Sequence, residues 1–514
     1  MHYYEVAPTK IVKADACVFT YSSQQPLAIG AVVIISIGQQ LLTGIVVKKT
    51  TKPDFATKEI TTILDLPPLP RPLLQTAQWM SNYYIAHLAL VLQTILPSGL
   101  TKKRRTLSPN STAATRRDRT HFVLNKDQSA AIDSLLNAKS GTVILHGVTG
   151  SGKTAVYIEY AKRLIATGKS VIVIVPEIAL TAQLIAEFQH SFPNLITTHS
   201  QQTEAQRHHA WLQALNATQP NVVIGPRSAL FMPFNNIGAI IIDEAHEPAL
   251  KQDQTPRYSA LRTAAILARY HHATVVQGSA TPLVSEYYLA AKTGRPIISL
   301  PARANPNIIT PSINVVDMTS KNGFLRHRFL SDLLINTINQ NLDNNKQTLI
   351  YHNRRGTAST TLCQNCGWSA LCPRCFIPMT LHADRHALIC HICGYRERVP
   401  TACPDCGSTD IVHKGIGTKL IESELQKLFP QAAIARFDGD ITSKNSLNQR
   451  YQELYDGHIN IIIGTQVVAK GLDLPRLASV GIIQADAGLA LPDFTTRERT
   501  FQLLAQVIGR VGRN

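Results

Sequence analysis

The loop at residues 147–154 constrains the fold more than any other part of the chain. It reads Gly-Val-Thr-Gly-Ser-Gly-Lys-Thr and follows the apolar run at 143–145. A G-x-x-x-x-G-K-[ST] loop between a buried strand and a helix wraps backbone amides around phosphates, while its lysine and hydroxyl meet the terminal phosphates and magnesium. We therefore predict a site for ATP and Mg²⁺ at Gly147, Thr149, Gly150, Ser151, Gly152, Lys153 and Thr154.

Two carboxylates, Asp243 and Glu244, follow the apolar run at 240–242. At the end of a buried strand, Asp243 is predicted to hold magnesium through water, and Glu244 to orient and deprotonate the attacking water. This arrangement favours hydrolysis over simple binding, although an acidic surface turn has the same residues. Upstream, the amide of Gln128 is predicted to read the adenine edge, but any glutamine that begins a helix has the same pattern.

Short apolar runs rich in β-branched residues recur between helical stretches. They lie at 143–145, 171–175, 222–224, 240–242 and 274–276, and again at 348–351, 461–463 and 480–483. Buried strands that alternate with helices indicate parallel sheets covered on both faces. We predict an α/β protein with one lobe at 122–302 and a second at 303–514.

The first hundred residues have a different pattern. Short strands, clearest in the pair 32–37 and 41–47 around a glycine turn, predict a small β domain over 1–100 that ends in a packing helix after a proline cluster. Residues 101–121 carry many Lys and Arg residues and almost no large apolar side chain. We interpret them as a basic linker, which either touches phosphates or is simply a solvated tether.

Eight of the nine cysteines form four Cys-x-x-Cys pairs within 363–406. With no export signal at the N-terminus, zinc is a better explanation than disulfides, and eight thiolates make two closed structural Zn²⁺ sites. We favour a nested arrangement, with the inner pairs on one metal and the outer pairs on the other, while a different pairing stays open. The predicted ligands are Cys363, Cys366, Cys372, Cys375, Cys390, Cys393, Cys403 and Cys406.

The formal net charge of +17 predicts attraction to polyanions, nucleic acid above all. Charge alone does not separate DNA from RNA or from an anionic membrane. No apolar run approaches the roughly 18–20 residues of a membrane span, and the N-terminus lacks a signal-peptide pattern. We expect a cytoplasmic protein with no membrane partner.

Several longer phrases resemble those of superfamily 2 helicases, and in particular the primosomal replication-restart helicases. They lie at 175–181, 224–231, 278–282, 353–356, 415–418, 464–473, 485–489 and 506–513. The resemblance implies two RecA-like lobes preceded by a β-barrel-like DNA-binding domain, with the zinc module inserted in the second lobe. It also implies an ATP-dependent 3′ to 5′ DNA helicase that acts on forked and single-stranded DNA. The implied partners are single-strand-binding protein, primosome proteins and the replicative helicase loader.

The resemblance assigns further site residues. Gly471 and Asp473 would complete the ATP pocket from the second lobe, and Arg510 and Arg513 would stabilise transition-state charge once the cleft closes. In the β domain, the pocket for a DNA 3′ end would comprise Phe19, Thr20, Gly30 and Lys58, with Thr20 standing where the family has aspartate.

The sequence also departs from the family pattern. The linker at 101–121 takes the place of a winged-helix domain, and the second lobe is expected to be incomplete at its C-terminus. These departures favour a rival interpretation, a scaffold that binds forks and unwinds little. An RNA helicase is a third interpretation, which only the family-specific phrases oppose.

Overall fold

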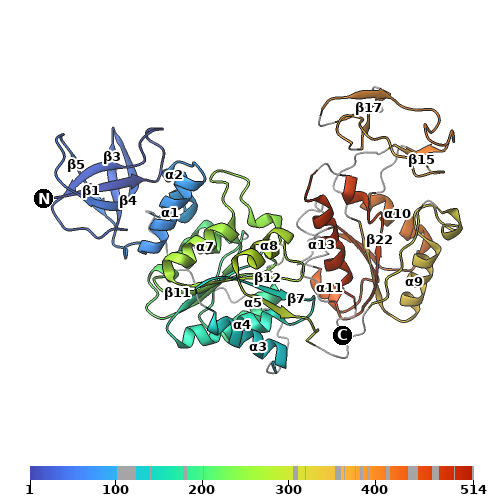
Figure 1. The fold of residues 1–514 in the computed structure, drawn as a ribbon, viewed down its shortest axis with the longest axis horizontal. Coiled ribbons are helices and arrows are strands. Elements are labelled where there is room, and N and C mark those ends of the chain that lie inside the picture. The colour runs from blue at the N-terminus through green and yellow to red at the C-terminus, as the bar shows by residue number, and fades with distance from the viewer. Residues whose placement is uncertain are drawn as a thin grey trace. The chain divides into compact units, whose positions relative to one another are not determined.

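The structure is a computed structural model that divides into two compact units, Met1–Ala304 and Asn305–Asn514. Figure 1 shows the fold of each unit. The structure describes residues 1–100, 123–138, 140–176, 182–200, 202–304, 311–318, 320–352, 361–363, 365–376, 378–382, 386–390, 393–412, 417–437, 450–465, 474–490 and 493–511.

The chain begins with a small closed β-sheet, as the sequence predicts. The predicted hairpin is present, with Ile37 paired to Gln40 across the turn. The segment 58–63 pairs with β2 at its start and with β3 at its end, which closes the sheet into a barrel around Tyr4, Val6 and Ile35. The strands, in the order β5-β2-β1-β4-β3-β6, are β1 (His2–Pro8), β2 (Phe19–Ser23), β3 (Val32–Ile37), β4 (Gln40–Thr50), β5 (Lys58–Glu59) and β6 (Thr62–Ile63).

Two helices follow the barrel where the sequence predicts one, namely α1 (Arg71–Tyr83) and α2 (Leu88–Ile95). The break comes at Ile85, whose φ of +50° is incompatible with a continuous right-handed helix. His87 then caps α2, because its Nδ1 accepts a hydrogen bond of 3.1 Å from the backbone N–H of Ala89.

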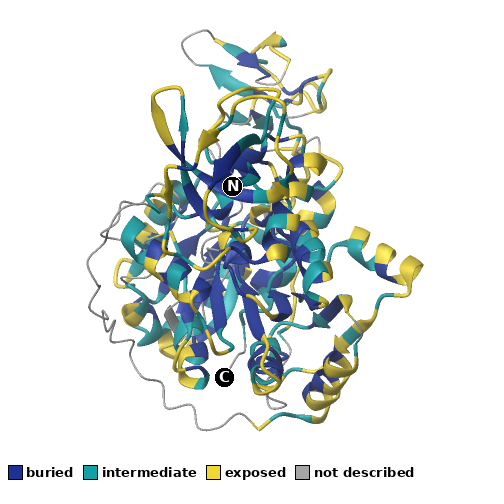
Figure 2. Ribbon diagram, turned by 90° about the vertical axis from the view of Figure 1, so that its left-hand side faces the viewer, coloured by how far each residue is buried: buried dark blue, intermediate teal, exposed yellow. Residues whose placement is uncertain are grey.

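The first lobe is a parallel sheet of seven strands with helices on both faces, as predicted. Alternate residues of β11 enter two cores: Ile240 and Ile242 pack with α7, and Ile241 packs with α3 and α4. Figure 1 shows α7 and α4 on opposite sides of the sheet, and Figure 2 shows the buried strands in dark blue. The strand order is β13-β7-β12-β11-β8-β10-β9. The strands are β7 (Gly141–Gly147), β8 (Ser170–Ile174), β9 (Ile196–Thr197), β10 (Val222–Gly225), β11 (Ile237–Ile242), β12 (Thr274–Ser279) and β13 (Ile297–Leu300), and the helices are α3 (Lys126–Asn137), α4 (Lys153–Ala166), α5 (Ala182–Ser191), α6 (Glu204–Leu215), α7 (Ala260–His271) and α8 (Val284–Thr293).

The barrel and the first lobe share one hydrophobic core. Met80 of α1 and Leu92 of α2 belong to the same buried cluster as Ile45 of the barrel and Leu267 of α7. In addition, the Tyr84 hydroxyl accepts a hydrogen bond of 3.0 Å from the backbone N–H of Ser259, just before α7. Burial of each such apolar side chain contributes about 1.5–3 kcal/mol, so the two parts hold together as one body.

The second unit contains a parallel sheet of four strands in the order β20-β21-β14-β22. Leu349 and Tyr351 of β14 pack with α11 and α13, whereas Ile350 between them packs with α9 and α10. This alternation confirms the second predicted α/β lobe. The strands are β14 (Gln347–Tyr351), β20 (Ile434–Phe437), β21 (Ile461–Gly464) and β22 (Leu477–Ile482), and the helices are α9 (Asp332–Asp343), α10 (Thr418–Leu428), α11 (Tyr451–Tyr455) and α13 (Thr496–Ile508).

Two small antiparallel sheets lie between β14 and α10 in the chain and carry the cysteines. They consist of β15 (Leu362–Cys363) with β19 (Ile411–Val412), and of β16 (Thr380–His382), β17 (Ala387–Ile389) and β18 (Arg396–Arg398). Among the helices that the structure describes, none combines the length and the apolar character that crossing a bilayer would take.

Candidate ATP and zinc sites

The phosphate loop connects β7 directly to α4. Gly150 and Gly152 have φ values of +82° and +81°, a region that side chains disfavour, so glycine is required at both positions. A Cβ on Gly147 would lie 2.5 Å from the Ser151 Oγ, which explains the glycine at the end of β7. The backbone of the loop can therefore approach a ligand closely.

The loop has features that fit phosphate oxygens. The Ser151 side chain is buried, and among the described residues its hydroxyl has no hydrogen-bond partner. No side chain caps the N-terminus of α4, which has 14 residues and begins at Lys153. Uncapped amides at a helix N-terminus attract anions, so this chemistry suits the phosphates of a nucleotide.

Lys153 and Gln128 both hold the loop. The Lys153 Nζ donates a hydrogen bond of 3.0 Å to the carbonyl of Gly147. The Gln128 Nε2 donates one of 2.9 Å to the carbonyl of Ser151, and its Oε1 accepts one of 3.0 Å from the N–H of Asn125. Both polar ends of the Gln128 amide are therefore engaged within the protein, beneath the phosphate loop.

The acidic pair follows β11, at the same C-terminal edge of the parallel sheet at which the phosphate loop follows β7. The Tyr157 hydroxyl donates a hydrogen bond of 2.9 Å to an Asp243 oxygen. The pKa of Asp243 is raised to about 6, chiefly by burial and then by the charge of Glu244, while Lys153 opposes both effects. A bound cation would stabilise the charged form of two neighbouring carboxylates that are partly removed from water. The pair is therefore suited to hold Mg²⁺.

A polar chain extends from the acidic pair to the end of β12. The Ser279 hydroxyl lies 2.7 Å from the His246 Nδ1 and accepts a hydrogen bond of 2.9 Å from the N–H of Thr281. The same His246 nitrogen lies 3.6 Å from a Glu244 carboxylate oxygen. The segment after β12 is thereby connected to the acidic pair through buried side chains.

Sequence reasoning missed Tyr157 as a site residue. It lies four residues after Lys153 on α4, a spacing that puts both on one helix face, and this was the available signal. Gly278 makes room for it, since a Cβ there would lie 1.7 Å from the Tyr157 hydroxyl oxygen. His146 was also missed: its Nδ1 lies 2.6 Å from the Tyr287 hydroxyl, which links β7 to α8.

The predicted residues of the second lobe are only partly described. Arg510 is half-buried just after α13 and has interaction partners. Gly471, Asp473 and Arg513 lie outside the described residues. Of the predicted catalytic residues, Lys153, Asp243 and Glu244 all lie within the first unit, where their charges interact.

The eight cysteines form two groups of four, the nested arrangement. In each group the sulfur atoms lie within 4.8 Å of one another. The Cys363–Cys406 and Cys372–Cys393 sulfur distances are both 3.6 Å, far longer than the roughly 2.05 Å of a disulfide. Four thiolates about 2.3 Å from a tetrahedral zinc stand close to this distance apart, so both groups fit zinc. The groups are Cys363, Cys366, Cys403 and Cys406, and Cys372, Cys375, Cys390 and Cys393.

The barrel brings three of the four predicted 3′-end residues near one another. Phe19 and Thr20 are consecutive on β2, and Lys58 on the adjacent β5 pairs with Tyr21. Gly30 lies beyond β1 and β4, where its N–H donates to the carbonyl of Val46 and a Cβ would lie 2.4 Å from the Leu69 carbonyl oxygen.

Four family models match the chain along most of its length. A 3′ DNA-binding domain model matches residues 13–97 and a DEAD/DEAH box helicase model matches 125–288. The model of the PriA DNA helicase Cys-rich region matches 372–398, and the helicase conserved C-terminal domain model matches 408–514.

Curated relatives named replication restart protein PriA include proteins of three bacteria. The chain is 38% identical to that of Bacillus subtilis over 76% of its own length and 49% of the relative's. For Treponema pallidum the identity is 37% over 89% and 68%, and for Rickettsia conorii it is 36% over 95% and 75%. The chain thus spans about half the length of the first relative and more of the other two.

Solved helicase structures are more distant. The DUF1998 helicase MrfA bound to DNA has a TM-score of 0.45 at 16% identity, covering 76% of this chain and 47% of its own. The DEAD-box helicase Mss116 bound to single-stranded RNA has a TM-score of 0.46 at 16% identity, covering 75% of this chain and 67% of its own.

The matches to the family models and to the curated relatives, together with the phosphate loop, acidic pair and cysteine groups, identify this chain as a member of the PriA family of replication restart helicases.

Proposed function

We propose that this chain hydrolyses ATP to move 3′ to 5′ along DNA and to unwind forked DNA in replication restart and primosome assembly. One observation above all supports the proposal: the charges of Lys153, Asp243 and Glu244 lie close enough to interact, in one half-buried cluster of the first lobe. A chain that only bound forks would have no use for two adjacent, half-buried carboxylates, because the pair destabilises the fold.

ATP and Mg²⁺ would be held by Lys153, Thr154 and Asp243, and Mg²⁺ would neutralise charge on the phosphates. Glu244 would orient the attacking water and accept its proton. Tyr157 fixes the Asp243 carboxylate through its hydrogen bond.

The second lobe would supply the remaining contacts. Gly471 and Asp473 would complete the pocket, and Arg510 and Arg513 would stabilise transition-state charge. An arginine that arrives from another lobe acts only in a closed cleft, which couples hydrolysis to lobe movement. When Glu244 accepts a proton during hydrolysis, the buried pair of His246 and Ser279 would transmit this change in charge to the segment after β12.

The other modules would serve the same substrate. The barrel would grip the 3′ end of a nascent strand through Phe19, Thr20, Gly30 and Lys58. The zinc module, folded by two Zn²⁺ ions, would assist strand separation and contact partner proteins. The proposed partners are single-strand-binding protein, primosome proteins and the replicative helicase loader.

The test is ATP hydrolysis by the purified chain without nucleic acid, with single-stranded DNA, with a fork that carries a nascent 3′ end, and with RNA. We expect the fork to stimulate hydrolysis most, and Lys153→Ala to abolish it. The exposed Lys162→Ala on α4 serves as a matched control that keeps the activity.

Two outcomes would contradict the proposal. Fork binding without stimulated hydrolysis would leave a fork-binding scaffold. Stronger stimulation by RNA than by any DNA would support an RNA helicase instead.

A further inference from the structure

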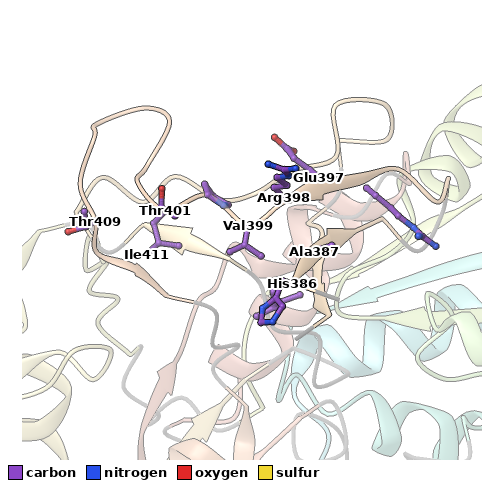
Figure 3. A pocket seen from close by; sticks show the side chains of 11 residues that line it. His386, Ala387, Glu397, Arg398, Val399, Thr401, Thr409 and Ile411 are labelled. Atoms are coloured by element: carbon purple, nitrogen blue, oxygen red, sulfur yellow. The ribbon is translucent and has the colours of Figure 1, made fainter. Parts of the chain in front are cut away.

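A groove of about 950 Å³ lies between the two small sheets of the zinc module. One wall is the strand β18 with Arg396 and Arg398, and the other includes Ile411 of β19 and Thr409 just before it. Figure 3 shows Thr409 and Ile411 at the left, Val399 near the centre, and Arg398 and His386 to its right. None of the cysteines that form the two metal sites lines it, so the groove is separate from the zinc ligands.

The groove is rich in hydrogen-bond donors. Arg396 and Arg398 are exposed and alternate along β18, so both lie on one face of the strand, about 7 Å apart. No residue that the structure describes forms a salt bridge with either guanidinium. Glu397, which also borders the groove, lies opposite Leu388 on the other face of the strand, so the lining keeps a net positive charge.

The backbone of β18 adds to these donors. Among the described strands, β18 pairs only with β17, so it is an edge of its sheet and leaves outward-facing N–H groups unused by a neighbouring strand. Thr401 and Thr409 contribute hydroxyl groups to the same groove. Arginine forks, threonine hydroxyls and backbone N–H groups are the groups that proteins use to contact phosphates.

We propose that this groove binds the phosphodiester backbone of single-stranded DNA, with Arg396 and Arg398 each contacting a phosphate. This inference rests on the proposed function and names a second contact for the same substrate. No described Phe, Tyr or Trp side chain lines the groove and His386 is its one aromatic ring, so successive bases would not stack along it and binding would depend little on sequence. An acidic peptide is the rival occupant, but the match to a 3′ DNA-binding domain elsewhere in the chain favours DNA.

The experiment measures binding of a single-stranded oligonucleotide to the full zinc-loaded chain over a range of salt concentrations. Each phosphate contact on a single strand contributes about 0.7 to the slope of log affinity against log salt. Arg396→Ala with Arg398→Ala should therefore reduce the slope by about 1.4 and weaken binding at low salt. Arg396→Lys with Arg398→Lys should keep most of the slope.

The charge-matched control is Lys346→Ala with Lys419→Ala, two exposed lysines outside the groove, which should leave the slope nearly unchanged. Zinc content is measured for every variant, and glutamine replaces alanine if the alanine variant loses metal. Equal slopes in the groove variant and the control overturn the proposal. So does binding of a polyglutamate peptide that requires both arginines while the DNA slope is unchanged.

The same samples separate this inference from the proposed function. DNA binding with the expected loss of slope, but without DNA-stimulated ATP hydrolysis, would contradict the motor and leave the groove assignment standing. Stimulated hydrolysis with equal slopes would do the reverse.

Discussion

At the scale of single residues, the acidic pair opposes folding. Asp243 is half-buried, and its removal from water together with the neighbouring Glu244 raises its pKa from an ordinary 3.8 to about 6. A carboxyl group whose pKa is raised by folding keeps its proton to a higher pH in the folded state than in the unfolded state. The fold therefore loses stability as the pH rises from about 4 to about 6.

Asp243→Asn should stabilise the first unit in the absence of Mg²⁺ and nucleotide. Asparagine keeps the acceptor for the Tyr157 hydroxyl and removes the buried charge. The rise in the Asp243 pKa from 3.8 to about 6 corresponds to about 3 kcal/mol of unfolding free energy, which the variant should gain above about pH 6 and lose again below about pH 4. Urea denaturation at both pH values measures the gain, and ATP hydrolysis should be lost.

The exposed Asp253→Asn is the control and should change stability little at either pH. If Asp243→Asn is no more stable than the parent chain above about pH 6, the buried charge does not have the destabilising effect described here.

A second residue-scale prediction concerns the barrel. Thr20 offers a neutral hydroxyl where an aspartate would accept a charge-assisted hydrogen bond from a 3′ hydroxyl. Thr20→Asp should strengthen binding of a DNA end with a free 3′ hydroxyl by about tenfold relative to a 3′-phosphate end, as one such bond contributes about 1.5 kcal/mol. Fluorescence anisotropy with the two ends measures this preference.

The matched control for this change is Thr62→Asp, on the exposed strand β6. An unchanged preference in Thr20→Asp would place the 3′ end elsewhere on the barrel.

At the scale of elements, periodicity predicted the strands well and the helix after the barrel less well. Buried strands such as β8 and β11 are uniform apolar runs that only a covered parallel sheet accommodates. The break between α1 and α2 has no such signal, because isoleucine is an unusual residue at a positive φ. Only the packing of both helices into the core shared with α7 accounts for it.

Ile85→Asn should stabilise the first unit by about 1 kcal/mol. The Ile85 side chain is 95% exposed, so nothing is lost from the core, and asparagine tolerates the left-handed conformation far better than a β-branched residue. Urea denaturation of the full chain measures the change. Ile11→Asn, another exposed isoleucine, should have little effect, and equal effects of the two variants would argue against strain at Ile85.

At the scale of the whole molecule, different forces hold the modules together. The barrel is joined to the first lobe by a buried hydrophobic cluster, whereas the zinc module has a small core of its own around Met379 and Leu388. A core of that size contributes little stability, so metal must supply most of the folding free energy of the module.

Removal of zinc with a chelator should therefore unfold the zinc module and leave the melting of the first unit unchanged. Trp368 packs against the core of the module, so its fluorescence reports the loss. Cys372→Ser should bind one zinc ion per chain instead of two, whereas Cys17→Ser, outside both groups, should bind two. A module that keeps its fluorescence without metal would contradict this dependence.

Residue type and local spacing were enough to predict the phosphate loop, the acidic pair, the four cysteine pairs and the alternation of strands and helices. Each of these follows from residue type and spacing along a few turns of chain. Contacts between residues that are distant in the sequence came from the folded structure alone, because packing and strand pairing bring these groups together. Tyr157 reaches Asp243 and Gln128 supports the phosphate loop. The two outer cysteine pairs form one group and the two inner pairs the other, and Arg396 and Arg398 border a groove.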